Sequence, residues 1–240
     1  MAAPFLGRIL GLRGSLPNIA DKSSTASCRI AQDIMDQLEL SEESTLAGQQ
    51  LGRALEHEVA VFLEENLPLA DSRRHWNVKR GRPVSEFVQY AHLGRLAQLV
   101  AEDESGTLEV ETGGDYLVRP DVTVGLKLEG GEFLHAAVSC KWTIRSDRVQ
   151  NIRHEGVILT RHRRGRQPHI VTVTAEPLPT RLAAIAKGTG EVDGVYHVAF
   201  DELRAAVDCE EDAEQRRVLE MLIDQERLMR FSELIGTLLL

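Results

Sequence analysis

The sequence SCKWTIRSDR, residues 139–148, ends an apolar alternating segment and begins a run of charged residues. Between residues 133 and 142 the side chains alternate with a period of two, which is typical of a β-strand. One face carries Ala137, Ser139 and Lys141, and the other carries Ala136, Val138, Cys140 and Trp142. The pattern predicts a central strand that brings Lys141 to its end, next to a cluster of arginines.

A second alternating segment, residues 115–127, precedes this strand. Its two faces carry Val118, Val122 and Val124 on one side and Arg119, Asp121 and Thr123 on the other. Because Gly130 and Gly131 mark a turn, the two segments are expected to pair as a hairpin. Strands are also predicted at 169–175 and 194–200, and helices at 27–40, 46–67, about 85–103, 146–164 and after residue 201.

Strands that alternate with helices around a hairpin predict an α/β fold, with a central mixed β-sheet flanked by helices. The length of 240 residues favours a single domain over 1–240. Residues 1–20 are expected to form an N-terminal arm or helix, and residues 201–240 the C-terminal helices. The segment through Trp76 and Pro83 is predicted to be a loop.

The composition is that of a globular protein, with 42% hydrophobic and 27% charged residues. No apolar run approaches the roughly 18 residues that would span a bilayer, so no membrane role is expected. The three cysteines are widely spaced and form no CxxC pair, which argues against a disulfide framework and a structural zinc site. A reducing compartment fits best, and we expect a cytoplasmic protein.

Charge is distributed unevenly along the chain. The formal net charge is −9, yet residues 141–166 hold eight basic and two acidic residues, a local charge of +6 that leaves −15 for the remainder. One positive face on a repelling body would orient a polyanion such as DNA. Charge alone fits a solvated basic helix equally well.

Asp121 and Lys141 are the first candidates for chemistry. If the two strands pair through the glycine turn, both side chains emerge on the same polar face near a strand end. A carboxylate that holds Mg²⁺ and an ammonium that stabilises developing charge are what metal-assisted phosphodiester hydrolysis needs. The alternative is an ordinary cross-strand ion pair.

The order of these residues resembles the PD…(D/E)xK nuclease fold, in which an aspartate after proline is followed by a strand ending in x-x-Lys. Ser139 stands where the second carboxylate of that pattern is expected. Glu155 is the candidate replacement, because it lies two helical turns beyond Arg148 and shares its face.

A more specific resemblance is to the NgoMIV group of type II restriction endonucleases. It rests on SCKWTIRSDR, Gln150–Asn151 and Glu155–Gly156, and on PHIVTVTAEPLPTR (168–181), GTGEVDGVYHVAF (188–200), QYAHL (89–93) and GQQLGRALE (48–56). These ordered blocks extend from about residue 18 to 203.

The resemblance implies a set of site residues. It makes Asp121 and Glu155 metal ligands together with the backbone carbonyl of Cys140, Lys141 the catalytic lysine, and Glu56 a further acid of the site. It also implies Mg²⁺ as the cofactor, with two ions in each active site. The Cys140 side chain is expected to be a small buried hydrophobe and not a nucleophile.

Two lines of reasoning indicate which residues read the DNA bases: the chemistry of the side chains and the family resemblance. Arginine pairs with guanine and aspartate accepts from cytosine, so Arg145, Asp147 and Arg148 at a helix start predict G·C-rich recognition, with a salt-bridged helix cap as the alternative. The resemblance assigns these three to a central CCGG and Arg181 to the outer base pair. It adds a minor-groove contact at Gln49 and further outer-base contacts at Asp21 and Ser23.

Together these features predict a Mg²⁺-dependent type II restriction endonuclease that cuts double-stranded DNA, with GCCGGC as its site and 5′-phosphate ends. The palindrome requires a two-fold dimer. The family implies a homotetramer of two dimers and a cognate DNA methyltransferase. Two alternatives remain: a repair or mobile-element nuclease of the same fold, and a catalytically inactive sequence-specific DNA-binding protein.

Overall fold

The fold is described by a computed structural model that covers residues 1–113, 117–144, 146–188 and 190–240, with the backbone alone for 146–148. Within these residues six strands form one sheet in the order β3-β4-β5-β6-β7-β8. The strands are β3 (Trp76–Arg80), β4 (Val122–Leu128), β5 (Gly131–Lys141), β6 (His169–Thr174), β7 (Gly194–His197) and β8 (Leu228–Arg230). The β3–β4 and β4–β5 pairs are antiparallel and the others are parallel, so the sheet is mixed as predicted.

The hairpin of β4 and β5 is the predicted central feature. Val122 pairs with Val138, and the hairpin closes where Leu128 pairs with Gly131. On its other side β5 pairs in parallel with β6, where Ala137 meets Ile170. The long alternating strand at the sequence centre is therefore also the centre of the sheet.

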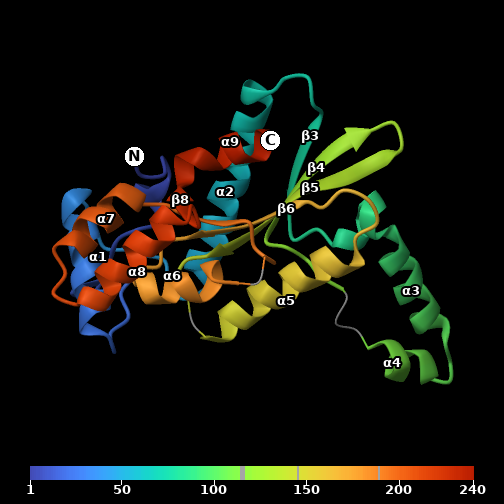
Figure 1. The fold of residues 1–240 in the computed structure, drawn as a ribbon, viewed down its shortest axis with the longest axis horizontal. Coiled ribbons are helices and arrows are strands. Elements are labelled where there is room, and N and C mark those ends of the chain that lie inside the picture. Colours follow the sequence, from blue (N-terminus) through green and yellow to red (C-terminus); the bar gives the residue numbers. More distant parts are fainter. Residues whose placement is uncertain (114–116, 145, 189) are drawn as a thin grey trace.

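Helices cover both faces of this sheet. They are α1 (Thr25–Gln37), α2 (Gln49–Ala70), α3 (Ala91–Glu102), α4 (Thr107–Thr112), α5 (Ser146–His162), α6 (Pro179–Ala186), α7 (Phe200–Asp208), α8 (Ala213–Asp224) and α9 (Leu234–Leu239). In Figure 1, α2 and α9 lie above the sheet and α5 lies below it, while α3 and α4 extend away to one side.

Two hydrophobic clusters correspond to the two faces of β5. Val138 and Cys140 belong to the larger cluster, which includes Leu55 of α2. Ala137 belongs to a second cluster with Leu159 of α5. The alternation predicted for this strand is confirmed, and it leaves Ser139 and Lys141 on the face that α5 covers.

Two strands differ from the sequence prediction. The segment predicted as a loop through Trp76 contains β3, an edge strand in which Val78 is buried while Lys79 and Arg80 are exposed. The C-terminal region contains β8, which joins the sheet beside β7. Both strands are short and only partly apolar, so they form only because they pair with segments that are distant in the sequence.

Two helices also differ from prediction. The helix predicted near 85–103 is divided into the 3-10 turns η2 (Val84–Glu86) and η3 (Val88–Tyr90) and α3. Phe87 is extended between the two turns, and the amide of buried Gln89 makes two 2.8 Å hydrogen bonds to the backbone of Leu134. The long helix α2 continues through Pro68 to Ala70, three residues beyond the predicted end at residue 67.

The first 20 residues, predicted as an arm or helix, contain the 3-10 turn η1 (Leu6–Arg8) and a small hairpin of β1 (Leu12–Arg13) and β2 (Leu16–Pro17). Phe5 and Ile9 of this segment are buried in the larger hydrophobic cluster. Across the part of the chain that the structure describes, no helix has the length and apolar character needed to cross a membrane.

Candidate active site

Asp121 and Lys141 meet at the end of the central hairpin. Asp121 immediately precedes β4 and Lys141 ends β5, so strand pairing brings them together across 20 residues of sequence. The Lys141 Nζ atom donates to Asp121 Oδ2 at 2.5 Å, and the backbone N–H of Cys140 donates to the same oxygen at 2.7 Å. The predicted convergence of the two side chains is confirmed.

Burial and charge act in opposite directions on the Lys141 ammonium. Burial lowers its pKa, but the attraction and hydrogen bond of Asp121 outweigh that effect, so the pKa of Lys141 lies above its ordinary value. The amine is therefore held in its charged form. A charged donor fixed beside a carboxylate is suited to stabilising negative charge on a phosphate.

Glu155 approaches the same face from α5. Its Oε2 atom lies 3.5 Å from the hydroxyl oxygen of Ser139. Ser139 stands at the position where the nuclease pattern has its second carboxylate. Burial raises the pKa of Glu155 to about 7; Lys141 opposes this increase and the nearby charge of Asp121 adds to it. The helix thus delivers a second carboxylate to the site, as the sequence predicted.

Gly156 explains how α5 comes so close. A Cβ atom at this position would lie 2.5 Å from the backbone oxygen of Glu191, so only glycine allows the helix to pack this close to the backbone at Glu191. This close contact is next to Glu155 in the chain.

Glu56 reaches the site from α2 and is paired with a residue that the sequence did not indicate. Arg80, the last residue of β3, places its guanidinium 3.1 Å from Glu56 Oε2. Arg80 pairs with Val122, directly after Asp121, so both residues border the active-site edge of the sheet. The loop prediction for this segment concealed Arg80; the available signal was Val78 between polar neighbours.

Cys140 is a core residue through its side chain. It is 2% exposed and belongs to the larger hydrophobic cluster. Burial, followed by the charge of Asp121, raises the pKa of the thiol well above its usual range, so no thiolate is available for nucleophilic attack. The expectation of a small buried hydrophobe is confirmed.

The donor set fits a cation held by two carboxylates. Among the described residues, no group of three histidine, cysteine, aspartate or glutamate side chains is arranged as a metal site. The carboxylates of Asp121 and Glu155 nevertheless repel each other on one side of the sheet. A hard cation that binds oxygen ligands would relieve this repulsion. Glu56 is occupied by Arg80, so it could hold a second ion only after releasing that partner.

The structure describes the side chains of only some of the predicted base readers. Arg145 lies outside the described residues. The backbones of Asp147 and Arg148 are in the first turn of α5, as predicted, and their side chains lie outside the described part of the structure. Gln49 is the exposed first residue of α2, seven residues before Glu56 on the same helix.

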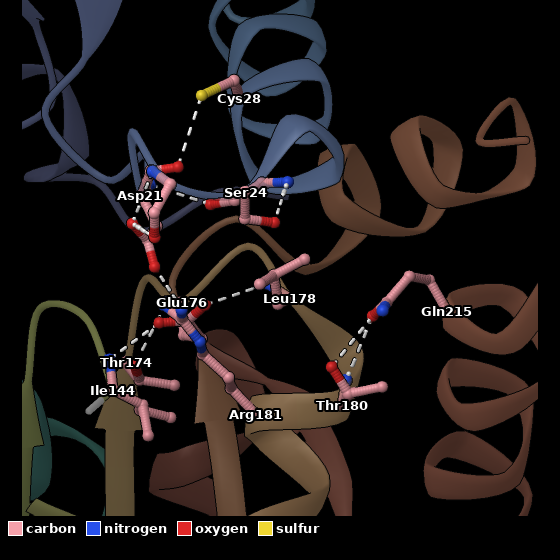
Figure 2. A network of polar contacts seen from close by, with 12 residues as sticks. Asp21, Ser24, Cys28, Ile144, Thr174, Glu176, Leu178, Thr180, Arg181 and Gln215 are labelled. Carbon is pink, nitrogen blue, oxygen red and sulfur yellow. Dashed lines mark hydrogen bonds and ion pairs between the residues drawn. The ribbon is translucent and has the colours of Figure 1, made fainter. Parts of the chain in front are cut away.

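Arg181, Asp21 and Ser23 form one polar network, although they are up to 160 residues apart. Figure 2 shows Arg181 extending toward Asp21. The Arg181 guanidinium donates to Asp21 Oδ2, while Asp21 Oδ1 accepts from the backbone N–H of Ser23 at 3.0 Å and from its hydroxyl at 2.7 Å. These bonds, above all that of Arg181, hold the pKa of Asp21 below its usual range. The three predicted outer-base contacts therefore lie together.

A groove of about 770 Å³ adjoins this network. Its lining comes from the N-terminal loop, the junction of β5 and α5, and the start of α6. The lining residues are Arg13, Ile19, Ala20, Asp21, Lys22, Thr143, Ile144, Val149, Thr180, Arg181 and Ala184. The groove thus connects the outer-base candidates with the residues that flank 145–148.

Comparison with known proteins places the chain in a family. The family model of the NgoMIV restriction enzyme matches residues 8–132 and 127–238. The chain is also 38% identical over 257 aligned positions to the type II restriction enzyme NgoMIV of Neisseria gonorrhoeae, covering 92% of this chain and 89% of that relative. It is therefore a restriction endonuclease, that is, a site-specific deoxyribonuclease. The chain belongs to the NgoMIV restriction enzyme family, as the sequence resemblance indicated.

Solved structures of two other restriction endonucleases show a weaker likeness. A complex of PspGI with substrate DNA matches with a TM-score of 0.40 and 12% identity over 80% of this chain and 61% of that chain. A pre-specific complex of BsaWI with DNA matches with a TM-score of 0.35 and 12% identity over 74% and 65%. At these TM-scores the family assignment depends on the sequence matches.

Proposed function

We propose that this restriction endonuclease hydrolyses double-stranded DNA at GCCGGC in a Mg²⁺-dependent reaction that leaves 5′-phosphate ends. The observation that carries the catalytic part is the contact of Lys141 with Asp121 on the face of the sheet where the partly buried carboxylate of Glu155 lies against Ser139. A charged amine and two carboxylates at one sheet end match the needs of phosphodiester hydrolysis.

In this proposal each residue has a distinct role. Asp121 and Glu155 would hold Mg²⁺ with the backbone carbonyl of Cys140, and Glu56 would take part in holding a second ion. When bound, Mg²⁺ supplies Lewis-acid stabilisation of the charge that develops on the phosphate. Lys141 leaves Asp121, donates to a phosphate oxygen and orients the attacking water. Because burial raises the pKa of Glu155 to about 7, a proton and a bound cation would compete for this carboxylate near neutral pH.

Recognition is assigned to the two ends of the groove. Arg145, Asp147 and Arg148 read the central CCGG, and Arg181 with Asp21 and Ser23 reads the outer pair; Gln49 contacts the minor groove. The network supports the outer assignment because Arg181 and Asp21 are already side by side, as bidentate guanine and cytosine contacts across one base pair require. Three arginines per subunit match three G·C pairs per half-site.

A palindromic site requires two copies of the chain related by a two-fold axis. We propose a homodimer that assembles further into a homotetramer, and a cognate DNA methyltransferase that protects the host sequence. The cytoplasmic location expected from the composition also stays a prediction.

The decisive experiment is digestion of a sequenced plasmid with pure protein and Mg²⁺, followed by mapping of the ends. We expect cuts confined to GCCGGC and ends that a ligase joins without prior phosphorylation. Asp121→Ala and Lys141→Ala should abolish cleavage while retaining specific binding, because neither residue contacts bases. Cuts without sequence preference would favour a repair or mobile-element nuclease. Binding without any cleavage would favour an inactive DNA-binding protein.

A further inference from the structure

Glu176 is a buried carboxylate with no part in the catalytic site. It lies two residues beyond the end of β6 and is fully buried, with 0% exposure. Its backbone is fixed on both sides: its N–H donates to Thr174 Oγ1 at 3.1 Å, and its carbonyl oxygen is 3.1 Å from His197 Nε2. Because His197 Nδ1 accepts from the N–H of Ala199, the Nε2 atom carries the proton and donates to Glu176.

The two carboxylate oxygens of Glu176 hold two different segments (Figure 2). Oε2 accepts the backbone N–H of Ile144 at 2.7 Å, and Oε1 accepts that of Leu178 at 3.1 Å. Ile144 immediately precedes residue 145, where the central base readers begin, and Leu178 is the N-cap residue of α6. One side chain therefore connects the start of the central recognition segment with the helix that carries Arg181.

Glu176 also faces Arg181 itself. Its Oε1 atom lies 3.8 Å from Arg181 NH1, while the other end of the guanidinium contacts Asp21. Burial is the main influence on this carboxyl group and raises its pKa to about 7, and the two backbone donors and Arg181 favour its ionised form. Glu176 thus holds one edge of the arginine fork while Asp21 holds the other, and both Arg181 and Asp21 line the groove.

Supporting groups of this kind decide how well an arginine reads a base. A bidentate contact to guanine depends on the guanidinium plane being fixed before DNA arrives, because a freely rotating arginine loses side-chain entropy on binding and also accepts other geometries. Asp21 cannot supply this support alone, since in the proposed complex it turns to cytosine. The buried counter-charge of Glu176 stays in place.

We propose that Glu176 is a positioning residue for sequence recognition: it fixes Arg181 for the outer base pair and ties that reader to the segment at Ile144. This inference rests on the proposed function, because it takes Arg181 to be the outer reader. Glu176 itself touches no DNA, so its effect must pass through Arg181.

The test compares cleavage of GCCGGC with cleavage of ACCGGT, which differs only at the outer pair. The ratio of the two kcat/KM values measures outer-pair discrimination, and a general loss of folded protein leaves it unchanged. Glu176→Gln is nearly isosteric but cannot accept both backbone N–H groups or balance the arginine charge. We expect it to lower the ratio by about fivefold or more, within the range of a bidentate contact.

A double-variant comparison shows whether the effect passes through Arg181. If it does, Glu176→Gln combined with Arg181→Ala should have the ratio of Arg181→Ala alone. Two independent effects that multiply would overturn the inference. Glu210→Gln is the matched control, since Glu210 is also buried and accepts an arginine and two backbone N–H groups, away from the groove. It should leave the ratio unchanged.

The remaining outcomes distinguish failure of this inference from failure of the proposed function. A wild-type enzyme that cuts both duplexes equally would overturn the proposed recognition site, and this inference with it. A discriminating wild type whose ratio Glu176→Gln leaves unchanged would overturn the inference alone. Should Glu176→Gln fail to fold, Glu176→Asp keeps the charge but withdraws the carboxylate by one methylene group. It should lower the ratio in the same direction, and an unchanged ratio would again contradict the inference.

Discussion

Glu155→Gln should stabilise the metal-free protein at alkaline pH while it abolishes cleavage. In the folded protein the pKa of Glu155 is raised to about 7 from 4.5, mainly by burial. The folded state therefore binds more protons than the unfolded state between these values, and its stability falls as the pH rises through this window. At about 1.4 kcal/mol for each pH unit, ionising Glu155 costs about 3 kcal/mol of stability at pH 8 and below about 1 kcal/mol at pH 5.

Urea unfolding of both proteins at pH 5 and pH 8, in EDTA and in Mg²⁺, measures this difference. In EDTA at pH 8 the variant should be more stable by up to about 3 kcal/mol, and at pH 5 the advantage should shrink to below about 1 kcal/mol. Glu176, whose pKa is also raised to about 7, titrates in the same window but is common to both proteins and cancels. Glu220→Gln removes an exposed carboxylate from α8 and controls for net charge.

Mg²⁺ should reverse the order of stability. A ligand present at 100 times its dissociation constant stabilises the folded state by about 2.7 kcal/mol, which wild type gains and the variant largely forgoes. Equal pH dependence of the two proteins would show that Glu155 is not held in a destabilising environment. A Mg²⁺ effect of the same size in both would show that Glu155 does not hold the metal.

Three further outcomes are expected. In a Glu155→Ala protein, Ser139→Glu should restore part of the cleavage rate, since it returns a carboxylate to the strand; no recovery, or full activity of Glu155→Ala alone, would contradict the replacement. Arg181→Ala should lower the cleavage ratio of GCCGGC to an outer-pair variant by about 5- to 150-fold per half-site, whereas equal loss on both would make it a phosphate contact. Plasmids with two GCCGGC sites should be cut faster than plasmids with one, and equal rates with a dimeric mass in solution would argue against a tetramer.

The central hairpin shows what sequence periodicity can determine. Because side chains alternate along a strand, the position of Cys140 in the core places Lys141 on the opposite face. The hairpin, which has a register shift between Val124 and Gly125, then brings Asp121 beside Lys141. Helical spacing likewise placed Glu155 on the face of α5 that meets Ser139. These are local patterns joined by one short connection, so few arrangements satisfy them.

Contacts between distant short segments could not be derived in this way. Arg80 reaches Glu56 only because β3 joins the sheet edge, and WNVKR has too few apolar residues to indicate a strand by itself. Glu176 had a weak signal, an acid directly after the buried strand HIVTVT, where an ionised side chain needs partners. Nothing in the local pattern identifies those partners as Ile144 and Leu178.

Among the side chains that the structure describes, the acids that the proposed function assigns to metal or DNA share one property: each is either paired with a basic residue or, like Glu155, has a raised pKa. Lys141 forms an ion pair with Asp121, Arg80 with Glu56 and Arg181 with Asp21. In each pair both side chains are between 18% and 39% exposed.

Partly exposed ion pairs contribute only about 0–1 kcal/mol, so exchanging partners costs little. DNA phosphates and bases can take the basic member of each pair while a cation or cytosine takes the acid. If only DNA or only the metal bound, one member of each ion pair would lose its partner and stay unpaired. In the proposed function, the active site is therefore assembled only when DNA and metal bind together. In this way a protein whose net charge is −9 can present a basic face only where DNA binds.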